Sequence, residues 1–136
     1  MKTKQLLFLL FAGILVLTGC KKEESTTLQK IQGKWSLVST VSSGKINGQA
    51  YSITVTGGAS DYIEFLSDGT FKEVVNSMSL SATGTYSVTD TQVTMTLNGS
   101  TVVNTIITLT DNSLILKYVT TIDANNYQGE TMTMKK

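Results

Sequence analysis

Few side chains in this sequence have the chemistry that a reaction requires. The 136 residues include no His, the residue most often used as a general base and as a metal ligand. The only Cys is Cys20, which excludes a disulfide within the chain and a zinc site built from thiolates. Glu64 and Glu73 flank a predicted turn at Asp68-Gly69 and could face each other as a pair. Glycoside hydrolysis needs two carboxyl groups at a defined separation, which nothing in the sequence sets, so we predict no catalytic residues and no enzymatic activity.

Two groups of Asp and Asn residues supply the oxygen ligands that calcium prefers, namely Asp111-Asn112 and Asp123 with Asn125 and Asn126. They lack the spacing of an EF-hand loop, and Asp and Asn are ordinary turn-forming residues. We therefore predict turns at both places, with no metal site and no cofactor. The formal net charge of +1 provides no basic footprint for nucleic acid, so no nucleic-acid partner is predicted.

The first 20 residues differ in kind from the rest. Lys2 and Lys4 precede an apolar run over residues 6–17, which is shorter than the roughly 20 residues of a spanning helix. A charged start, a short apolar run and small residues after it are typical of a secretory signal, and an ordinary signal peptide or a buried helix is the alternative. Leu17-Thr18-Gly19-Cys20 resembles the bacterial lipobox. The resemblance implies that 1–19 is a lipoprotein signal peptide and that fatty acyl chains such as palmitate on Cys20 anchor the protein in a membrane.

The residues that follow Cys20 are charged. Lys22, Glu23 and Glu24 resemble the export signal of surface lipoproteins in the Bacteroidetes, in which Cys and any one residue precede Lys and two acidic residues. This resemblance implies a lipid-anchored protein of the outer membrane, exposed at the cell surface. Charged and polar residues also suit a plain solvated tether over 20–27, and in that case the protein faces the periplasm.

From residue 28 on, the pattern is that of strands. Leu28 and Ile31 form one apolar edge of a helical turn over 28–32, which Gly33 ends. Nine short strands are then predicted, at 34–42, 51–56, 62–66, 70–75, 84–88, 93–97, 101–109, 114–122 and 127–134. Tight turns at Asp68-Gly69 and Asn98-Gly99 make neighbouring strands antiparallel. Most runs are shorter than the about 9–11 residues of a transmembrane barrel strand. We predict an all-β domain over 28–136, an antiparallel up-and-down barrel of about eight strands or else a sandwich, with loops at 43–50, 57–60 and 76–83.

Gly33-Lys34-Trp35 is the one motif in the body of the chain. It resembles the Gly-x-Trp signature at the start of the lipocalin barrel. Together with residues 28–39, 63–71 and 84–86 it resembles the small lipocalin-like domain of Bacteroidetes lipoproteins. The resemblance implies a barrel with a closed end plugged by Trp35 and an open end able to admit a ligand. The chain has no Arg to cover the Trp ring, a role left to Lys117, Lys135 or Lys136, and no helix follows the last predicted strand.

Five large side chains alternate with polar neighbours and are predicted to point into one interior: Tyr86, Met95, Leu97, Tyr118 and Met132. An eight-stranded barrel is just wide enough either to hold one small ligand or to be filled by its own side chains. Two functions therefore stay open for what we expect to be a monomer. The barrel binds a small apolar or amphipathic molecule, or a filled barrel presents flexible polar loops at 43–50 and 57–61 to a glycan or a partner protein.

Overall fold

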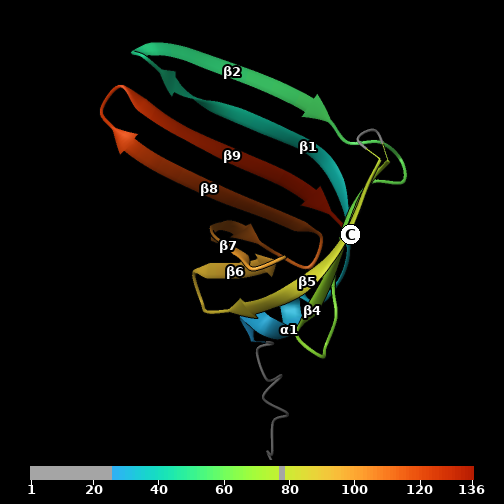
Figure 1. Ribbon diagram of the computed structural model, residues 1–136. Helices are drawn as coiled ribbons and strands as arrows, with labels where there is room; N and C mark the ends of the chain where they lie inside the picture. Colours follow the sequence, from blue (N-terminus) through green and yellow to red (C-terminus); the bar gives the residue numbers. More distant parts are fainter. Residues whose placement is uncertain (1–25, 77–78) are drawn as a thin grey trace, which may run out of the picture.

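Nine antiparallel strands and one short helix make up the part of the chain that the computed structural model describes, residues 26–76 and 79–136 (Figure 1). The helix α1 spans Thr27–Ile31 and directly precedes the first strand. The strands in chain order are β1 (Gly33–Ile46), β2 (Gln49–Thr56), β3 (Tyr62–Phe65), β4 (Thr70–Val75), β5 (Leu80–Val88), β6 (Gln92–Leu97), β7 (Ser100–Leu109), β8 (Ser113–Asp123) and β9 (Asn126–Lys135). Each of the nine predicted runs corresponds to one of these strands.

Eight of the strands close into a barrel. Consecutive strands from β3 to β9 pair in chain order, and β9 pairs with β1, which closes the circuit. The opposite edge of β1 is divided, because its first residues pair with β3 whereas Ser39 to Ile46 pair with β2. The ninth strand, β2, therefore extends β1 as a hairpin outside the closed circuit. The predicted all-β, antiparallel, up-and-down barrel of about eight strands is confirmed, and the sandwich is excluded.

Two of the predicted loops contain strand residues. β1 and β2 continue to a two-residue turn at Asn47-Gly48, where both residues have positive φ, 51° and 79°. β5 begins at Leu80 and takes up the second half of the loop predicted at 76–83. Residues 42–45 show little apolar alternation, so the predicted strand ends at residue 42. A close approach of two backbones holds this part of the hairpin instead, since a Cβ atom at Gly44 would overlap the backbone of Tyr127 on β9. The expectation of a flexible loop over 43–50 is therefore wrong.

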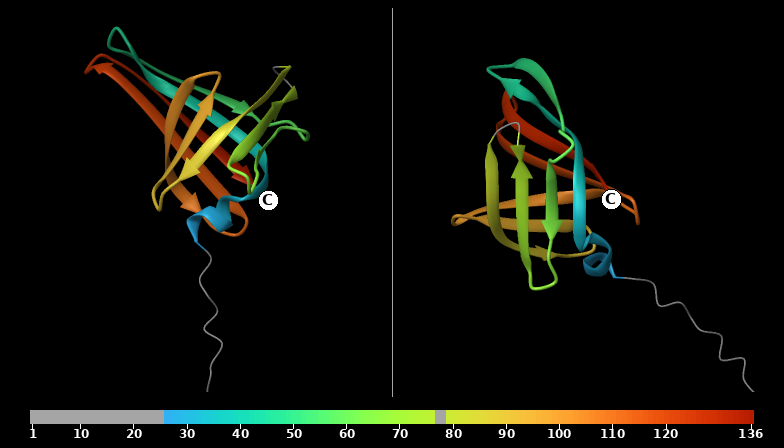
Figure 2. Two further views of the ribbon diagram at one scale, coloured as in Figure 1. Left: turned by 60° about the horizontal axis from the view of Figure 1, so that its bottom comes forward. Right: turned by 90° about the vertical axis from the view of Figure 1, so that its right-hand side faces the viewer.

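The barrel is closed at one end and open at the other (Figure 2). β7 and β8 pair only between Thr105–Leu109 and Leu114–Lys117, so their remaining halves diverge. Four strands, β2, β1, β9 and β8, lie side by side and project past the open end as an arm (Figure 1). No described pairing joins β2 to β3 either, so the barrel wall is interrupted on both sides of this arm.

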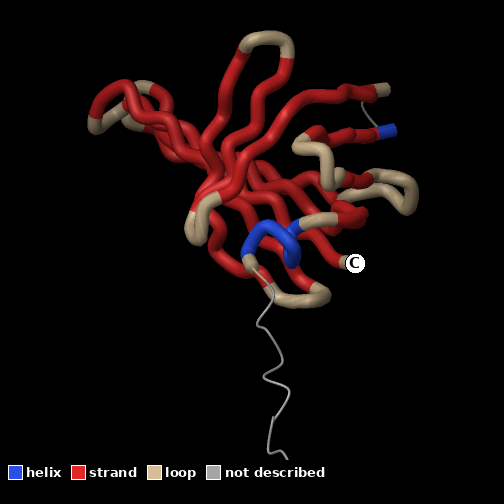
Figure 3. Tube along the Cα trace, turned by 90° about the horizontal axis from the view of Figure 1, so that it is seen from below, coloured by secondary structure: helices blue, strands red, loops and turns tan. Residues whose placement is uncertain are grey.

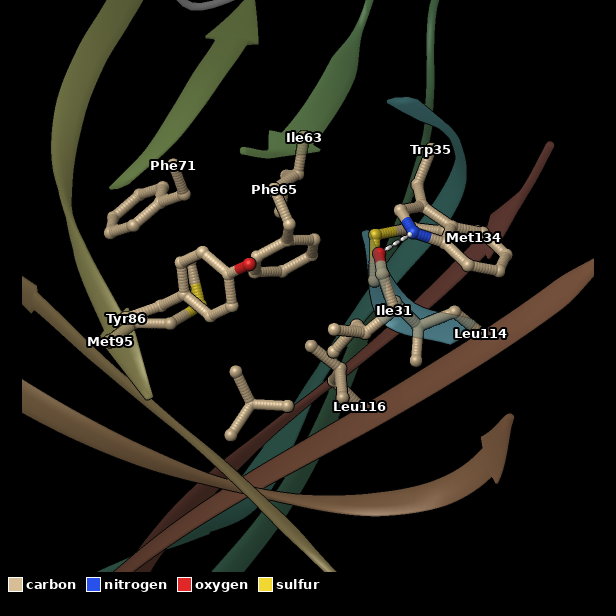
Figure 4. Close-up of a cluster of buried hydrophobic side chains, with 11 residues drawn as sticks. Ile31, Trp35, Ile63, Phe65, Phe71, Tyr86, Met95, Leu114, Leu116 and Met134 are labelled. Carbon is tan, nitrogen blue, oxygen red and sulfur yellow. Dashed lines mark hydrogen bonds between the residues drawn. The ribbon is translucent and has the colours of Figure 1, made fainter. Parts of the chain in front are cut away.

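Buried side chains fill the closed end, and α1 lies against it (Figures 3 and 4). A capping box between Thr26 and Gln29 starts the helix, and Gly33, with a φ of 108°, turns the chain into β1. The helix, every described strand and this core lie after residue 25, so the described residues contain a hydrophobic core of their own, as a domain requires. No helix among the described residues has the length and apolar character needed to cross a membrane.

Candidate functional site

Trp35 lies at the centre of the closed end. Its ring has no solvent exposure, and its indole Nε1 donates a hydrogen bond of 2.6 Å to the backbone oxygen of Ile31 at the end of α1 (Figure 4). The Lys136 ammonium lies 4.5 Å from the centre of the ring and donates to the backbone oxygen of Lys30 at 3.1 Å. Lys136 is thus the lysine, of the three considered, that covers the Trp ring. These contacts join the helix, the first strand and the C-terminus, and they make the closed end structural.

A cavity of about 500 Å³ lies above this core, toward the open end. Residues from β3, β4 and β6–β9 line it: Ile63, Phe71, Glu73, Met95, Leu97, Asn98, Ser100, Val102, Asn104, Tyr118, Glu130 and Met132. The diverging halves of β7 and β8 border the cavity. Its wall is mostly apolar with a few polar groups, which is the usual character of a small-molecule site.

Four of the five side chains predicted to line a cavity meet in this one, namely Met95, Leu97, Tyr118 and Met132. Tyr86 does not line it. The Tyr86 ring packs edge-on against Phe65 at 5.0 Å (Figure 4). Its hydroxyl donates a hydrogen bond of 2.8 Å to the backbone oxygen of Leu66. Burial raises the pKa of the Tyr86 phenol. Alternation correctly turned Tyr86 inward, but it gives the face of a residue and not its height in the barrel, and Tyr86 lies in the core below the cavity.

A second, smaller cavity of about 230 Å³ adjoins the first on the side of β1 and β2. Leu37, Val55, Asp61 and Leu80 are among its lining residues. Three residues line both cavities: Glu73, Glu130 and Met132. The two glutamates therefore lie where the two spaces meet.

Glu73 on β4 and Glu130 on β9 are the acidic groups of the larger cavity. Burial raises the pKa of the Glu73 carboxyl above its usual value, and the nearby charge of Glu130 raises it further. The expected pairing of Glu73 with Glu64 is wrong: Glu64 lies opposite Lys72 in the β3–β4 ladder and on the other face of the sheet, whereas Glu73 lies opposite Ile63. Glu130 was not singled out from the sequence, although it continues the inward alternation of Met134 and Met132.

Asn104 on β7 is the second feature that the sequence did not reveal. The residue is 2% exposed, and its side-chain oxygen Oδ1 is buried without a hydrogen-bond partner, the one such atom among the described side chains. It lines the larger cavity between Val102 and the apolar core. A buried polar atom left unpaired costs about 1–3 kcal/mol, so native proteins seldom keep one without a reason.

The Asp and Asn clusters form turns. The Asp123 carboxylate accepts hydrogen bonds from the Asn125 backbone at 2.7 Å and from the Asn126 amide at 3.0 Å, and these bonds lower the pKa of Asp123. No three acidic residues gather around a common point in the part of the chain described. The loop before β3 is held in place by the buried Asp61, which accepts from the backbone N–H groups of Gly58 and Asn76 at 2.8 Å each. Residues 57–61 thus form a loop, as predicted, and Asp61 anchors its end to neighbouring backbone.

Cys20 and the charged residues Lys22, Glu23 and Glu24 lie outside the described residues, as does most of the predicted tether over 20–27. Their roles in lipidation and export stay predictions. Gly33 and Trp35, the predicted barrel-closing motif, lie at the closed end as set out above.

Comparison with known proteins gives a match to one family. The sequence pattern of the family described as "Lipocalin-like domain" matches residues 31–116. The structure is similar to that of the bovine lipocalin allergen Bos d 2, with a TM-score of 0.48 and 16% sequence identity over 81% of this chain and 75% of that one. No curated protein matches the chain in sequence.

Proposed function

Because this chain belongs to the family of lipocalin-like domains, we propose that its barrel binds one small amphipathic molecule in the cavity above the core. The closed end has the contacts of a structural plug, so the proposal concerns the open end. The apolar body of the ligand would lie against Met95, Leu97 and Val102. Its polar end would meet the groups on β4, β7 and β9.

The cavity itself is the observation that supports this function most strongly. Its volume of about 500 Å³ falls within the range of about 300–1,000 Å³ that is usual for ligand sites. It remains although large side chains face the interior, because the upper halves of β7 and β8 diverge. A barrel of eight strands that fills its interior with side chains would leave no such space.

Native mass spectrometry of residues 21–136 after incubation with a bacterial lipid extract tests the proposal. We expect a bound small molecule on the wild-type domain. Met95→Trp and Tyr118→Trp should reduce its occupancy, because the larger rings fill the cavity. Ile107→Trp, a similar enlargement at an exposed position of β7, is the control and should leave occupancy unchanged. A bare protein mass in every wild-type spectrum would refute the proposal.

We also propose that the protein is a bacterial lipoprotein, anchored through Cys20 in the outer membrane and exposed at the cell surface. The tetrapeptide ending at Cys20 and the charges of Lys22, Glu23 and Glu24 support this proposal. The position of α1 is compatible with it, because this helix lies at the closed end of the barrel (Figure 2) and its N-cap, Thr26, is six residues after Cys20. A lipid attached there would leave the open end facing away from the membrane.

A second candidate function, contact with a glycan or a partner protein, is favoured by the arm. Ile46, Ile53 and Ile122 on the arm are 60%, 59% and 84% exposed. A hollow of about 280 Å³ near the tip includes Ile46, Ile122 and Tyr127. The filled barrel expected under this alternative does not agree with the cavity. Binding on a glycan array or to a partner protein that is lost with Ile122→Ser, together with a bare protein mass, would favour this function.

A further inference from the structure

The charge of the cavity is one-sided. Glu73 on β4 and Glu130 on β9 both line it, and no lysine is among the residues that line either this cavity or the one beside it. Such an arrangement is unusual for a site that binds fatty acids, whose carboxylates would meet two further carboxylates at close range. The negative charge therefore limits which ligands the cavity can bind. This inference rests on the proposed binding function.

Asn104 supplies a second and independent indication. The residue lines the same cavity, and its side-chain oxygen, which is buried and has no partner, can only accept a hydrogen bond. A ligand that fits this atom must bring an N–H or O–H group into the cavity. A carboxylate group cannot do so, because it carries acceptors only.

We propose that the cavity selects organic amines, that is, ligands with an apolar or aromatic body and a protonated amino group placed among Glu73, Glu130 and Asn104. An ammonium group has three N–H donors, enough for two carboxylates and one amide oxygen. Its positive charge compensates for the burial of the Glu73 carboxylate and for the repulsion between Glu73 and Glu130. These are the two causes that raise the pKa of Glu73. The Tyr118 ring, which lines the same space, adds a face that can attract a cation.

Three water-soluble indoles with the same ring and different end groups test the selectivity: tryptamine, which is a cation, tryptophol, which is neutral, and indole-3-propionate, which is an anion. Titration calorimetry of residues 21–136 at neutral pH measures the affinity of each. We expect tryptamine to bind about tenfold more tightly than tryptophol, a difference of about 1.4 kcal/mol, and indole-3-propionate to bind more weakly than both.

Isosteric variants locate the effect. Glu73→Gln and Glu130→Gln should each weaken tryptamine about tenfold and leave tryptophol within about twofold. Asn104→Leu should weaken tryptamine about fivefold. Glu64→Gln removes the same charge from the outer face, opposite Lys72, and should change nothing. Thermal unfolding of each variant shows whether it is folded.

The outcomes separate this inference from the proposed function. Equal affinity for all three indoles, or a preference for indole-3-propionate, would overturn the selection of amines and leave a ligand-binding barrel. Loss of tryptamine binding with Glu64→Gln as large as with Glu73→Gln would overturn the assignment to the cavity. Binding of calcium ions that depends on Glu73 and Glu130, without binding of tryptamine, would replace the amine by a metal. If none of the indoles binds, the inference fails, and a bare protein mass after incubation with lipid extract would show that the proposed function fails with it.

Discussion

Replacing Trp35 by Ala should destabilise the domain severely. The ring is fully buried at the closed end, and substituting a buried Trp by Ala costs about 3–5 kcal/mol through lost burial and the cavity left behind. The change also removes the hydrogen bond from Nε1 to Ile31, which leaves that backbone oxygen without its partner. A domain has about 5–15 kcal/mol of stability in all, so Trp35→Ala should leave little of it.

Two milder variants divide this effect into its parts. Trp35→Phe keeps an aromatic ring and loses the hydrogen bond, so its cost should fall between wild type and Trp35→Ala. Lys136→Met keeps the length of the side chain and loses the ammonium above the ring, which should cost about 0.5–1 kcal/mol. Comparison with Lys135→Met, whose charge is not placed over the ring, controls for the change in net charge.

Urea unfolding of residues 21–136, followed by circular dichroism, measures the free energy of unfolding of each protein. From most to least stable, the expected order is wild type, Lys136→Met, Trp35→Phe and Trp35→Ala. A cost below about 1 kcal/mol for Trp35→Ala would refute the reasoning, because a ring that plugs a barrel cannot be removed at the price of a surface substitution.

Three further predictions concern the cavity and the N-terminal segment. Because the pKa of Glu73 is raised in the folded state, the folded protein binds more protons than the unfolded chain between the two pKa values, so stability should fall as pH rises through that interval. Thermal unfolding across pH should show this decline in stability. The Glu73→Gln variant should show a smaller decline and should be more stable than wild type at neutral pH. An unchanged decline in that variant would contradict the assignment of the effect to Glu73. Cys20→Ala should abolish metabolic labelling with a fatty acid and leave an uncleaved precursor, and undiminished labelling would rule out the lipid anchor. Replacing Lys22, Glu23 and Glu24 together by Ala should preserve lipidation but protect the protein from protease added to whole cells, and a wild-type protein that is already protected would place it on the periplasmic side.

The number and order of the strands could be predicted because alternation and turn residues are local signals. The register of β3 and β4 could not, because it depends on one residue of the connection. A two-residue turn at Asp68-Gly69 would place Glu64 opposite Glu73. In the structure Leu66 donates to Thr70 and the loop holds three residues, with Gly69 at a φ of 84°, so each side chain of one strand moves to the other face relative to its expected partner.

The candidate site could be predicted only in part, and for a related reason. Period-two alternation turned Met95, Leu97, Tyr118 and Met132 inward, and the structure brings them to one cavity. The height of each residue in the barrel depends on strand offset, which the sequence does not show, and so Tyr86 was misplaced. Asn104 and Glu130 were missed because a search for apolar inward residues passes over polar ones. Both lie at inward positions on strands whose other inward residues are mostly apolar, which is the signal that could have found them.

The location of a bound ligand tests the central claim most directly. Methionine methyl groups labelled with ¹³C report on it by NMR, since Met95 and Met132 line the cavity whereas Met134 lies in the core at the closed end. Titration of residues 21–136 with tryptamine and with tryptophol should shift the Met95 and Met132 methyl signals together and leave Met134 in place. Shifts at Met134 with none at Met95 and Met132, or no shift at any of the three at saturating ligand, would contradict a binding site above the core.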